Sequence, residues 1–502
     1  MLREVRGQRS EVRRVAAIFS LISGICFLTS GCSLAPDFKM PDMQLPTKFK
    51  EQQQPPINDG SWKIGVPAES VNRGEWWKIF GDPQLDNLEA EAAKSSQSLK
   101  AATARVQQSR AIMRVALGDL FPEIDLGGNA LRSKPAAAAG AAYGIPATQF
   151  HPYTLYSAGG TISYEADLFG SGQDNYRAAK SDAASSEAVF QSVLLALQAD
   201  VAQNYFAIRT MDADRVLLRD TVKIREEAER IMGQRFNAGD VGEQDYVRAQ
   251  TELASARADL IALDKQRADT DHALALLLGK LPTEFTLAEM PLTEMPPVIP
   301  AGLPSSLLER RPDIASAQNQ MASANSRIGV ARAAFFPKLN LTGSGGFESV
   351  QLQHLFQWSS RTWALGPLFG TALTVPVFDG GKNFANLDLA KSGYEESVAN
   401  YRQQVLVAFR EVEDNLNDQR LLAEQLKQQD IAAKAARRSA ELSRHRYDEG
   451  ESDYFEVVDE ERTSLAAQRA EVEVKGARFA TTVTLIRALG GGWEIRNEVH
   501  PE

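Results

Sequence analysis

The 502-residue sequence contains little cysteine and little histidine. Its two cysteines, Cys26 and Cys32, lie close to the N-terminus, so the body of the chain can form neither a disulfide framework nor a cysteine-based metal site. The five histidines are scattered without a close pair. No Ser/His/Asp or paired-carboxylate spacing is present, and glycine clusters such as "GSG" lack the context of a phosphate loop. We therefore expect no enzyme activity, no metal site and no cofactor.

Long apolar runs and excess positive charge are also missing. No stretch after the N-terminal region has about 18 consecutive apolar residues, so we expect no transmembrane helix there. The net charge is −10, and an acidic protein is a poor candidate for binding nucleic acid. Any role in a membrane would then require a β-barrel or a lipid anchor.

The N-terminal 31 residues have the pattern of a targeting segment. Five arginines precede the apolar stretch "VAAIFSLISGICFL", and "TSGC" ends at Cys32. Small residues before a cysteine resemble a bacterial lipobox, which implies acyl and diacylglycerol lipid on Cys32. The alternatives are a plain secretory signal or an uncleaved anchor. Cleavage before Cys32 would remove five Arg and two Glu, and so change the net charge from −10 to −13.

The chain contains an internal repeat. Three pairs of similar segments occur in the same order, with the second copy roughly 210 residues after the first. These are "LGDLFPEIDLGG" and "ARAAFFPKLNLTG", "YEADLFGSGQDN" and "LTVPVFDGGKNF", and the glycine breaks "RFNAGDVGEQ" and "RYDEGESDYF". The order predicts a duplicated unit of helix, strand hairpin and long helix pair.

The helical parts are unusually long. Residues 173–232 and 395–449 contain neither glycine nor proline, and sixty helical residues would extend about 90 Å. Val193, Leu197 and Val201 lie on one helical stripe. This pattern alone is also compatible with a soluble coiled-coil rod.

Short alternating segments separate the helices. "EIDLGGNALR", "TISYEAD" and "KLNLTGSG" alternate apolar and polar residues, which predicts strands, and residues 368–377 form a less regular fourth segment. Such alternation with long loops is typical of transmembrane barrels, whose smallest members have about eight strands. Four strands cannot close a barrel, and an open edge in lipid leaves backbone groups unpaired. Several chains must therefore share one barrel.

The sequence resembles the TolC-like outer-membrane channel proteins of tripartite efflux systems, in particular their lipidated, NodT-like branch. The resemblance covers nearly the whole mature chain. It is carried by "GCSLAPDF", "WWKIFGDPQLDNL", "RRPDIASAQNQMASANSRIGVARAAFFPKL", "VFDGG" and "RYDEGESDYFEVVDEER".

This resemblance implies a mainly α fold with a small transmembrane β part, assembled as a homotrimer. Each protomer would give four strands to a twelve-stranded β-barrel and several helices to a periplasmic α-barrel. The partners would be outer-membrane lipid, a periplasmic membrane-fusion adaptor and an inner-membrane RND-type pump. The channel would be a passive, gated exporter of drugs or other small molecules. The expected order begins with a signal segment (1–31) and a lipidated N-terminal segment (32–84). A first repeat (85–281, strand hairpin 123–167) and a second repeat (303–490, strand hairpin 338–377) follow, joined by a Pro-rich linker (282–302). A C-terminal tail (491–502) ends the chain.

The resemblance also implies site residues. The breaks at Gly239 and Gly450 would be helix–turn–helix tips, since glycine permits the left-handed backbone that ends a helix. Phe455 and Asp459 would form the periplasmic constriction, where three carboxylates attract cations. The remaining expected sites are the tip and gate contacts and the helix–strand junctions: Asp245, Tyr447, Arg446, Arg462, Phe121, Pro122, Phe336 and Pro337.

Two other functions remain open from the sequence. A type I-like protein secretion duct has the same architecture, because cargo choice belongs mostly to the pump. A lipid-anchored periplasmic coiled-coil spacer without a pore needs neither alternating strands nor Phe-Pro junctions, and both are present here.

Overall fold

A computed structural model gives the architecture of most of the chain. The described residues are 33–43, 46, 48–51, 74–134, 136, 151–297, 299, 309–365 and 373–491. The expected signal segment, Cys32 and residues 492–502 of the expected tail lie outside these residues, as does part of the expected linker.

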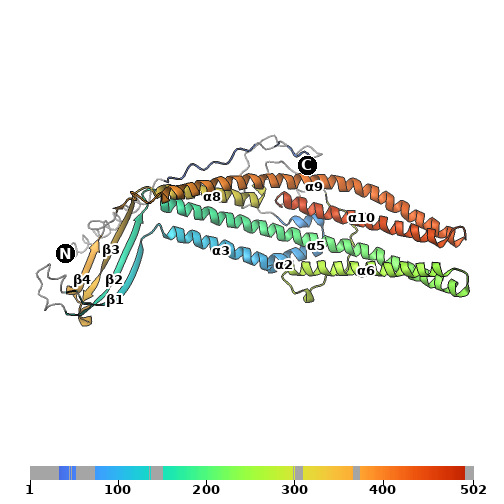
Figure 1. Cartoon of the computed structure of the whole chain (residues 1–502), viewed down its shortest axis with the longest axis horizontal. Helices are drawn as coiled ribbons and strands as arrows, with labels where there is room; N and C mark the ends of the chain where they lie inside the picture. Colours follow the sequence, from blue (N-terminus) through green and yellow to red (C-terminus); the bar gives the residue numbers. More distant parts are fainter. Residues whose placement is uncertain are drawn as a thin grey trace, which may run out of the picture. The chain divides into compact units, whose positions relative to one another are not determined.

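Long helices dominate the fold (Figure 1). Two of them, α5 and α9, contain 68 and 67 residues, so each extends about 100 Å. Short 3₁₀ turns accompany the helices, among them η1 (Trp76–Phe80). The α-helices are α2 (Pro83–Ser95), α3 (Gln97–Gly118), α5 (Ser171–Ala238), α6 (Glu243–Leu277), α8 (Pro312–Ala333), α9 (Lys382–Asp448) and α10 (Tyr454–Ala488).

The strands form one antiparallel sheet in the order β1-β2-β3-β4, and the short β5 also pairs with β3. Their bounds are β1 (Glu123–Ser133), β2 (Tyr153–Ala166), β3 (Lys338–Ser349), β4 (Arg361–Leu365) and β5 (Leu373–Thr374). The central pair β2–β3 joins the two sequence repeats, because each repeat supplies one of these strands.

The register separates apolar from polar side chains. Ile124 pairs with Ile162, and Asp125 pairs with Thr161, so the two types alternate between the faces. Ile124 and Leu126 are 70% and 87% exposed. Large apolar side chains left uncovered on one sheet face are typical of a surface that contacts another protein or a membrane.

Two strands begin earlier than the sequence indicated. The alternating segment expected from residue 161 extends back to Tyr153, because β2 pairs with β1 from Tyr153 and with β3 from Tyr156. β5 lies inside the expected segment 368–377, residues 368–372 lie outside the described part, and β4 adds strand pairing from Arg361, ahead of that segment. Pairing of β4 with Gly343–Phe347 sets its start, and this partner is not visible in the local pattern.

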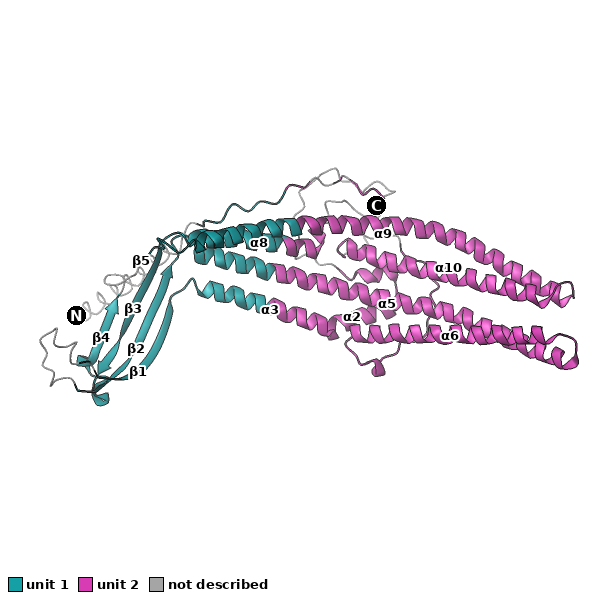
Figure 2. Cartoon of the chain, in the orientation of Figure 1, with its two compact units in different colours: residues 1–41, 107–184, 318–400 teal, residues 42–106, 185–317, 401–502 magenta. Residues whose placement is uncertain are grey.

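The chain divides into two compact units (Figure 2). Unit 1 comprises residues 1–41, 107–184 and 318–400 and contains the sheet. Unit 2 comprises residues 42–106, 185–317 and 401–502. Each sequence repeat contributes to both units, so the compact units do not coincide with the repeats.

Unit 2 has the main apolar core, in which Trp76, Tyr205 and Phe479 are buried. Asp82 caps the N-terminus of α2 and accepts hydrogen bonds from the Tyr205 hydroxyl (2.6 Å) and from Arg209 Nη1 (2.7 Å). These two bonds satisfy Oδ2 of the buried carboxylate, whose Oδ1 accepts the capping bonds of α2. They fasten α2 to α5.

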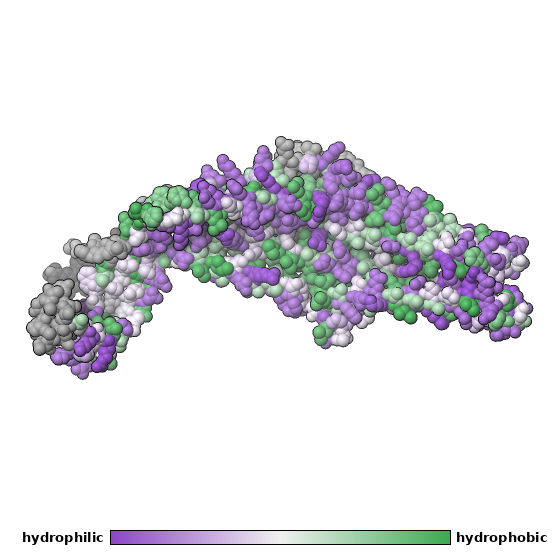
Figure 3. Space-filling view, in the orientation of Figure 1, coloured by the Kyte–Doolittle hydropathy of each residue, from purple (hydrophilic) through white to green (hydrophobic). Residues whose placement is uncertain are grey.

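Hydrophilic residues are prominent on the visible face of the helices (Figure 3). Among the described residues, none of the helices combines the length and the apolar character that a membrane crossing requires.

Candidate functional site

The two glycine breaks are helix ends with the same backbone geometry. Gly239 and Gly450 have φ of +80° and +79°. After α5, Gly239 N–H donates to Phe236 O and Asp240 N–H donates to Arg235 O. After α9, Gly450 N–H donates to Tyr447 O and Glu451 N–H donates to Arg446 O. This pair of bonds is the Schellman motif, which satisfies carbonyl groups at the end of a helix.

Each turn leads directly into the next helix. Gly242 is the N-cap of α6, and Asp453 is the N-cap of α10, where its side chain accepts a bond of 3.0 Å from Glu456 N–H. The chain thus forms two helical hairpins, α5–α6 and α9–α10, and the turns and the contacts around them lie in unit 2.

The expected constriction residues lie one helical turn apart on α10. Phe455 is 52% exposed, and Asp459 is exposed as well. Both line a groove of about 410 Å³ between α6 and α10. The α6 side of this groove includes Val247, Arg248 and Thr251. The guanidinium of Arg248 lies over the Phe455 ring, 4.7 Å from its centroid.

The expected gate residue Arg462 joins the two hairpins. Its guanidinium contacts both carboxylate oxygens of Glu252 on α6, with Nε 3.1 Å from Oε2. Glu252 is only 3% exposed and also pairs with Arg225 of α5 at 2.8 Å. Arg225 donates a second bond to the Glu252 carbonyl oxygen. A buried carboxylate on one hairpin is therefore held by arginines from both hairpins.

The expected gate residue Tyr447 also joins the hairpins, through a partner that the sequence did not indicate. Arg235 Nη1 of α5 donates to the Tyr447 hydroxyl at 2.6 Å. Burial raises the pKa of Tyr447, and the nearby carboxylate of Asp245 adds to this rise. Among the described residues, no hydrogen bond joins Asp245 to Tyr447.

Other contacts lie within the second hairpin. The expected gate residue Arg446 pairs with Glu456 at 2.6 Å, and Arg444 pairs with Glu461 at 3.3 Å. Burial raises the pKa of the Glu461 carboxyl above its ordinary value, while Arg444 opposes this rise. Burial also raises the pKa of Tyr454 to about 12. Arg446 therefore ties α9 to α10 rather than one hairpin to the other.

The expected Phe-Pro junctions lie between helices and strands of unit 1. Phe121 N–H donates to Gly118 O at the end of α3, and Pro122 directly precedes β1. At the end of α8, Phe336 N–H donates to Ala333 O, and Pro337 directly precedes β3. Proline cannot continue a helix, so it marks the change to extended backbone.

The residues after Cys32 are fastened to the helices of unit 1. Ser33 Oγ donates to Asp174 Oδ1 at 2.7 Å. Arg332 donates to the Leu34 carbonyl oxygen and Asn325 donates to that of Pro36. These three bonds attach Ser33, Leu34 and Pro36 to the helices of unit 1.

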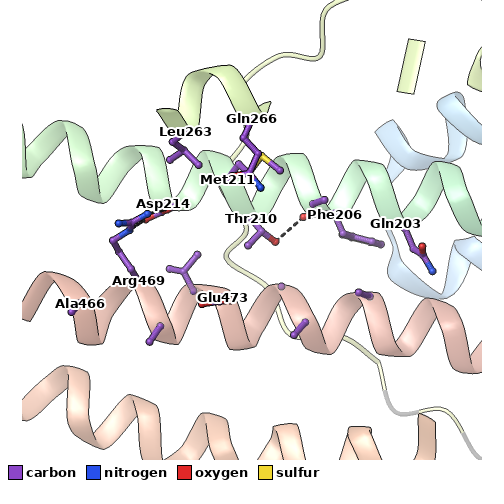
Figure 4. Close-up of a pocket in the computed structure, with 16 residues that line it drawn as sticks. Gln203, Phe206, Thr210, Met211, Asp214, Leu263, Gln266, Ala466, Arg469 and Glu473 are labelled. Carbon is purple, nitrogen blue, oxygen red and sulfur yellow. Dashed lines mark hydrogen bonds and ion pairs between the residues drawn. The ribbon is translucent and has the colours of Figure 1, made fainter. Parts of the chain in front are cut away.

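A second hollow, of about 650 Å³, lies between α5, α6 and α10 (Figure 4). Arg469 and Asp214 pair across it through two contacts of 2.8 and 2.9 Å. Gly476 allows close packing of α10 on α5, because a Cβ there would overlap Thr210. The hollow is therefore part of the contact between the hairpins.

The structure adds partners that sequence reasoning missed. Arg235, Arg248 and Glu252 have no distinctive motif, and each lies at an ordinary helical position. Only their spatial neighbours on the other hairpin identify them. In the described part of the chain, no three His, Cys, Asp or Glu side chains are grouped in a way that could hold a metal ion.

Comparisons with known proteins place the chain among efflux channels. The model of the family described as "Outer membrane efflux protein" matches residues 88–280 and 303–491. The cation efflux system protein CusC of Escherichia coli O157:H7 is 31% identical over 94% of this chain and 98% of its own length. The pyoverdine export outer membrane protein OpmQ of Pseudomonas aeruginosa is 34% identical over 95% and 97%.

A solved structure agrees with these matches. The CmeC outer membrane channel of Campylobacter jejuni superposes with a TM-score of 0.83 at 28% identity, covering 92% of this chain and 96% of that one. The expected TolC-like, mainly helical fold, the efflux-channel function and the outer-membrane location are confirmed. The chain belongs to the outer membrane efflux protein family, whose members are outer-membrane channels of efflux systems.

Proposed function

We propose that three copies of this chain form one gated duct and that the α5–α6 and α9–α10 turns form its periplasmic mouth. Family membership and the uncovered apolar face of the sheet support this assembly. The duct opens and closes passively, without catalysis. A periplasmic membrane-fusion adaptor engages the turns, and an inner-membrane RND-type pump supplies the energy.

The observation that carries the gate is the binding of Glu252 by Arg462 from the other hairpin. Opening requires the hairpins to separate, which breaks this link and the Arg235–Tyr447 bond. Phe455 narrows the mouth by its size and poor wetting, and Asp459 places a carboxylate one helical turn away.

The N-terminus supplies a second attachment to the membrane. Cys32 carries the acyl and diacylglycerol lipid, as the lipobox-like "TSGC" implies. Support comes from a relative described as a probable outer membrane lipoprotein, SilC of Salmonella typhimurium, which is 30% identical. Cys32→Ala should abolish metabolic labelling of the chain with palmitate, while unchanged labelling would contradict this assignment.

The cargo is proposed as small molecules or drugs. Relatives are described as exporters of cations, pyoverdine, solvents and toluene, which are all small. No contact in the described part of the chain favours a secretion duct or a spacer over this reading.

Cysteine crosslinking in intact cells tests the proposal. The mature chain contains no cysteine beyond Cys32, so Asp240→Cys and Glu451→Cys place unique thiols in the two turns. We expect both to crosslink to an adaptor identified by mass spectrometry, whereas Lys100→Cys on α3 should not. Purified protein should run as a trimer and conduct ions in planar bilayers. A lone subunit without conductance would refute the proposal.

A further inference from the structure

A cation faces the expected constriction. Arg248 of α6 lies with its guanidinium 4.7 Å from the centroid of the Phe455 ring of α10. This distance lies within the range of a cation–π interaction. Arg248 and Asp459 line the same groove between α6 and α10.

Nearby carboxylates do not neutralise Arg248. Glu252 lies one helical turn from Arg248 but is occupied by Arg225 and Arg462. In the described part of the chain, Arg248 forms no ion pair within 4.0 Å. Arg462, which lines the same groove, and Arg225 both pair with Glu252. The positive charge of Arg248 is therefore available to act on the mouth of the duct.

We propose that Arg248 is a selectivity-determining residue of the channel, which sets the charge of the mouth and holds the Phe455 ring in place. The inference rests on the proposed function, in which Phe455 and Asp459 line the constriction. The resemblance implied a ring of three carboxylates at the constriction. With Arg248 in the same groove as Asp459, each protomer also brings a positive charge to the constriction, so its cation preference is moderated.

Two effects of Arg248 are separable by substitution. Arg248→Gln removes the charge and the cation–π contact, whereas Arg248→Lys keeps the charge on a point-like ammonium with weaker stacking. Removing one charge about 6 Å from a permeating cation in water changes the local cation occupancy about threefold. We therefore expect Arg248→Gln to raise the cation-to-anion permeability ratio about threefold or more, and Arg248→Lys to stay close to wild type.

The experiment is the reversal potential of purified full-length trimers in planar bilayers under a KCl gradient. The matched control is Arg257→Gln on the same helix, where an exposed arginine pairs with Glu226 outside the groove. We expect this control to keep the wild-type ratio. We expect Asp459→Asn to lower the ratio, and the Arg248→Gln/Asp459→Asn double variant to lie between the two single variants.

The outcomes separate this inference from the proposed function. If Asp459→Asn shifts the reversal potential while Arg248→Gln matches wild type and Arg257→Gln, the inference is overturned and the proposed function stands. If wild-type protein forms no conducting trimer, the proposed function fails, and this inference fails with it. If Arg248→Gln does not assemble, Arg248→Met and Arg248→Lys are compared instead, and equal ratios in these two overturn the inference.

Discussion

Replacing Arg462 with alanine separates gating from folding. The substitution removes the bond between α10 and Glu252 but leaves the Arg225–Glu252 pair of the first hairpin in place. The buried carboxylate therefore keeps one counter-charge. We expect the helices to remain folded while the two hairpins lose one of their links near the turns.

The magnitude follows from the exposure of the two partners. A hydrogen bond to a charged group contributes about 1.5 to 3 kcal/mol. The Arg462 side chain is 57% exposed, so solvent screening lowers its contribution to about 1 kcal/mol. Three copies in a trimer contribute about 3 kcal/mol together, which corresponds to about a hundredfold change in the ratio of closed to open mouths.

Glu252→Gln provides the contrast. It leaves Arg225 buried without its counter-charge, and breaking a buried pair in this manner costs about 3 to 5 kcal/mol. We expect Glu252→Gln to lower the thermal midpoint of helix unfolding, measured by circular dichroism. Arg462→Ala should change this midpoint little.

The assays are single-channel conductance in bilayers and growth inhibition by a large antibiotic that the outer membrane normally excludes. We expect Arg462→Ala to increase both, and Arg230→Ala, which breaks an exposed pair within α5, to change neither. If Arg462→Ala is present in the membrane at normal abundance and shows wild-type conductance and wild-type antibiotic sensitivity, the Glu252–Arg462 bond does not hold the mouth closed.

Three further changes probe the same hairpins. Gly450→Ala should lower the free energy of unfolding by about 1–2 kcal/mol, because Gly450 has φ of +79°. Gly242→Ala should lower it far less, because Gly242 has φ of −75° and open space around it. Equal losses of stability in the two variants would contradict the backbone argument. Tyr447→Phe removes the hydroxyl that accepts from Arg235, so conductance at rest should rise, and an unchanged current would exclude this bond from the gate. Burial raises the pKa of Glu461, so the folded state binds this proton more tightly than the unfolded state, and stability should fall as pH rises above about 4.5 through the raised pKa. Glu461→Gln should remove the fall in thermal midpoint that the Glu461 carboxyl causes as pH rises. If the midpoint of Glu461→Gln depends on pH as that of the wild type does, Glu461 does not cause this fall.

Local sequence determined the elements and the places where they end. Gly239 and Gly450 end helices because glycine adopts positive φ without strain, and Pro122 and Pro337 lie where helices give way to strands. These are properties of single residues and their immediate neighbours, so they are readable without a fold. The resemblance then supplied the efflux-channel function, and the comparisons confirmed it.

Tertiary structure alone decided which residues meet across the hairpins. The Tyr447 hydroxyl accepts a hydrogen bond from Arg235, and Arg462 binds Glu252, and each of these partners is more than 200 positions away in the chain. Such pairs depend on the rotation and axial offset of two packed hairpins, and no local pattern encodes either quantity. The strand β4, which begins at Arg361 ahead of the expected segment 368–377, was missed for the same reason, since pairing with a distant strand decides where it begins.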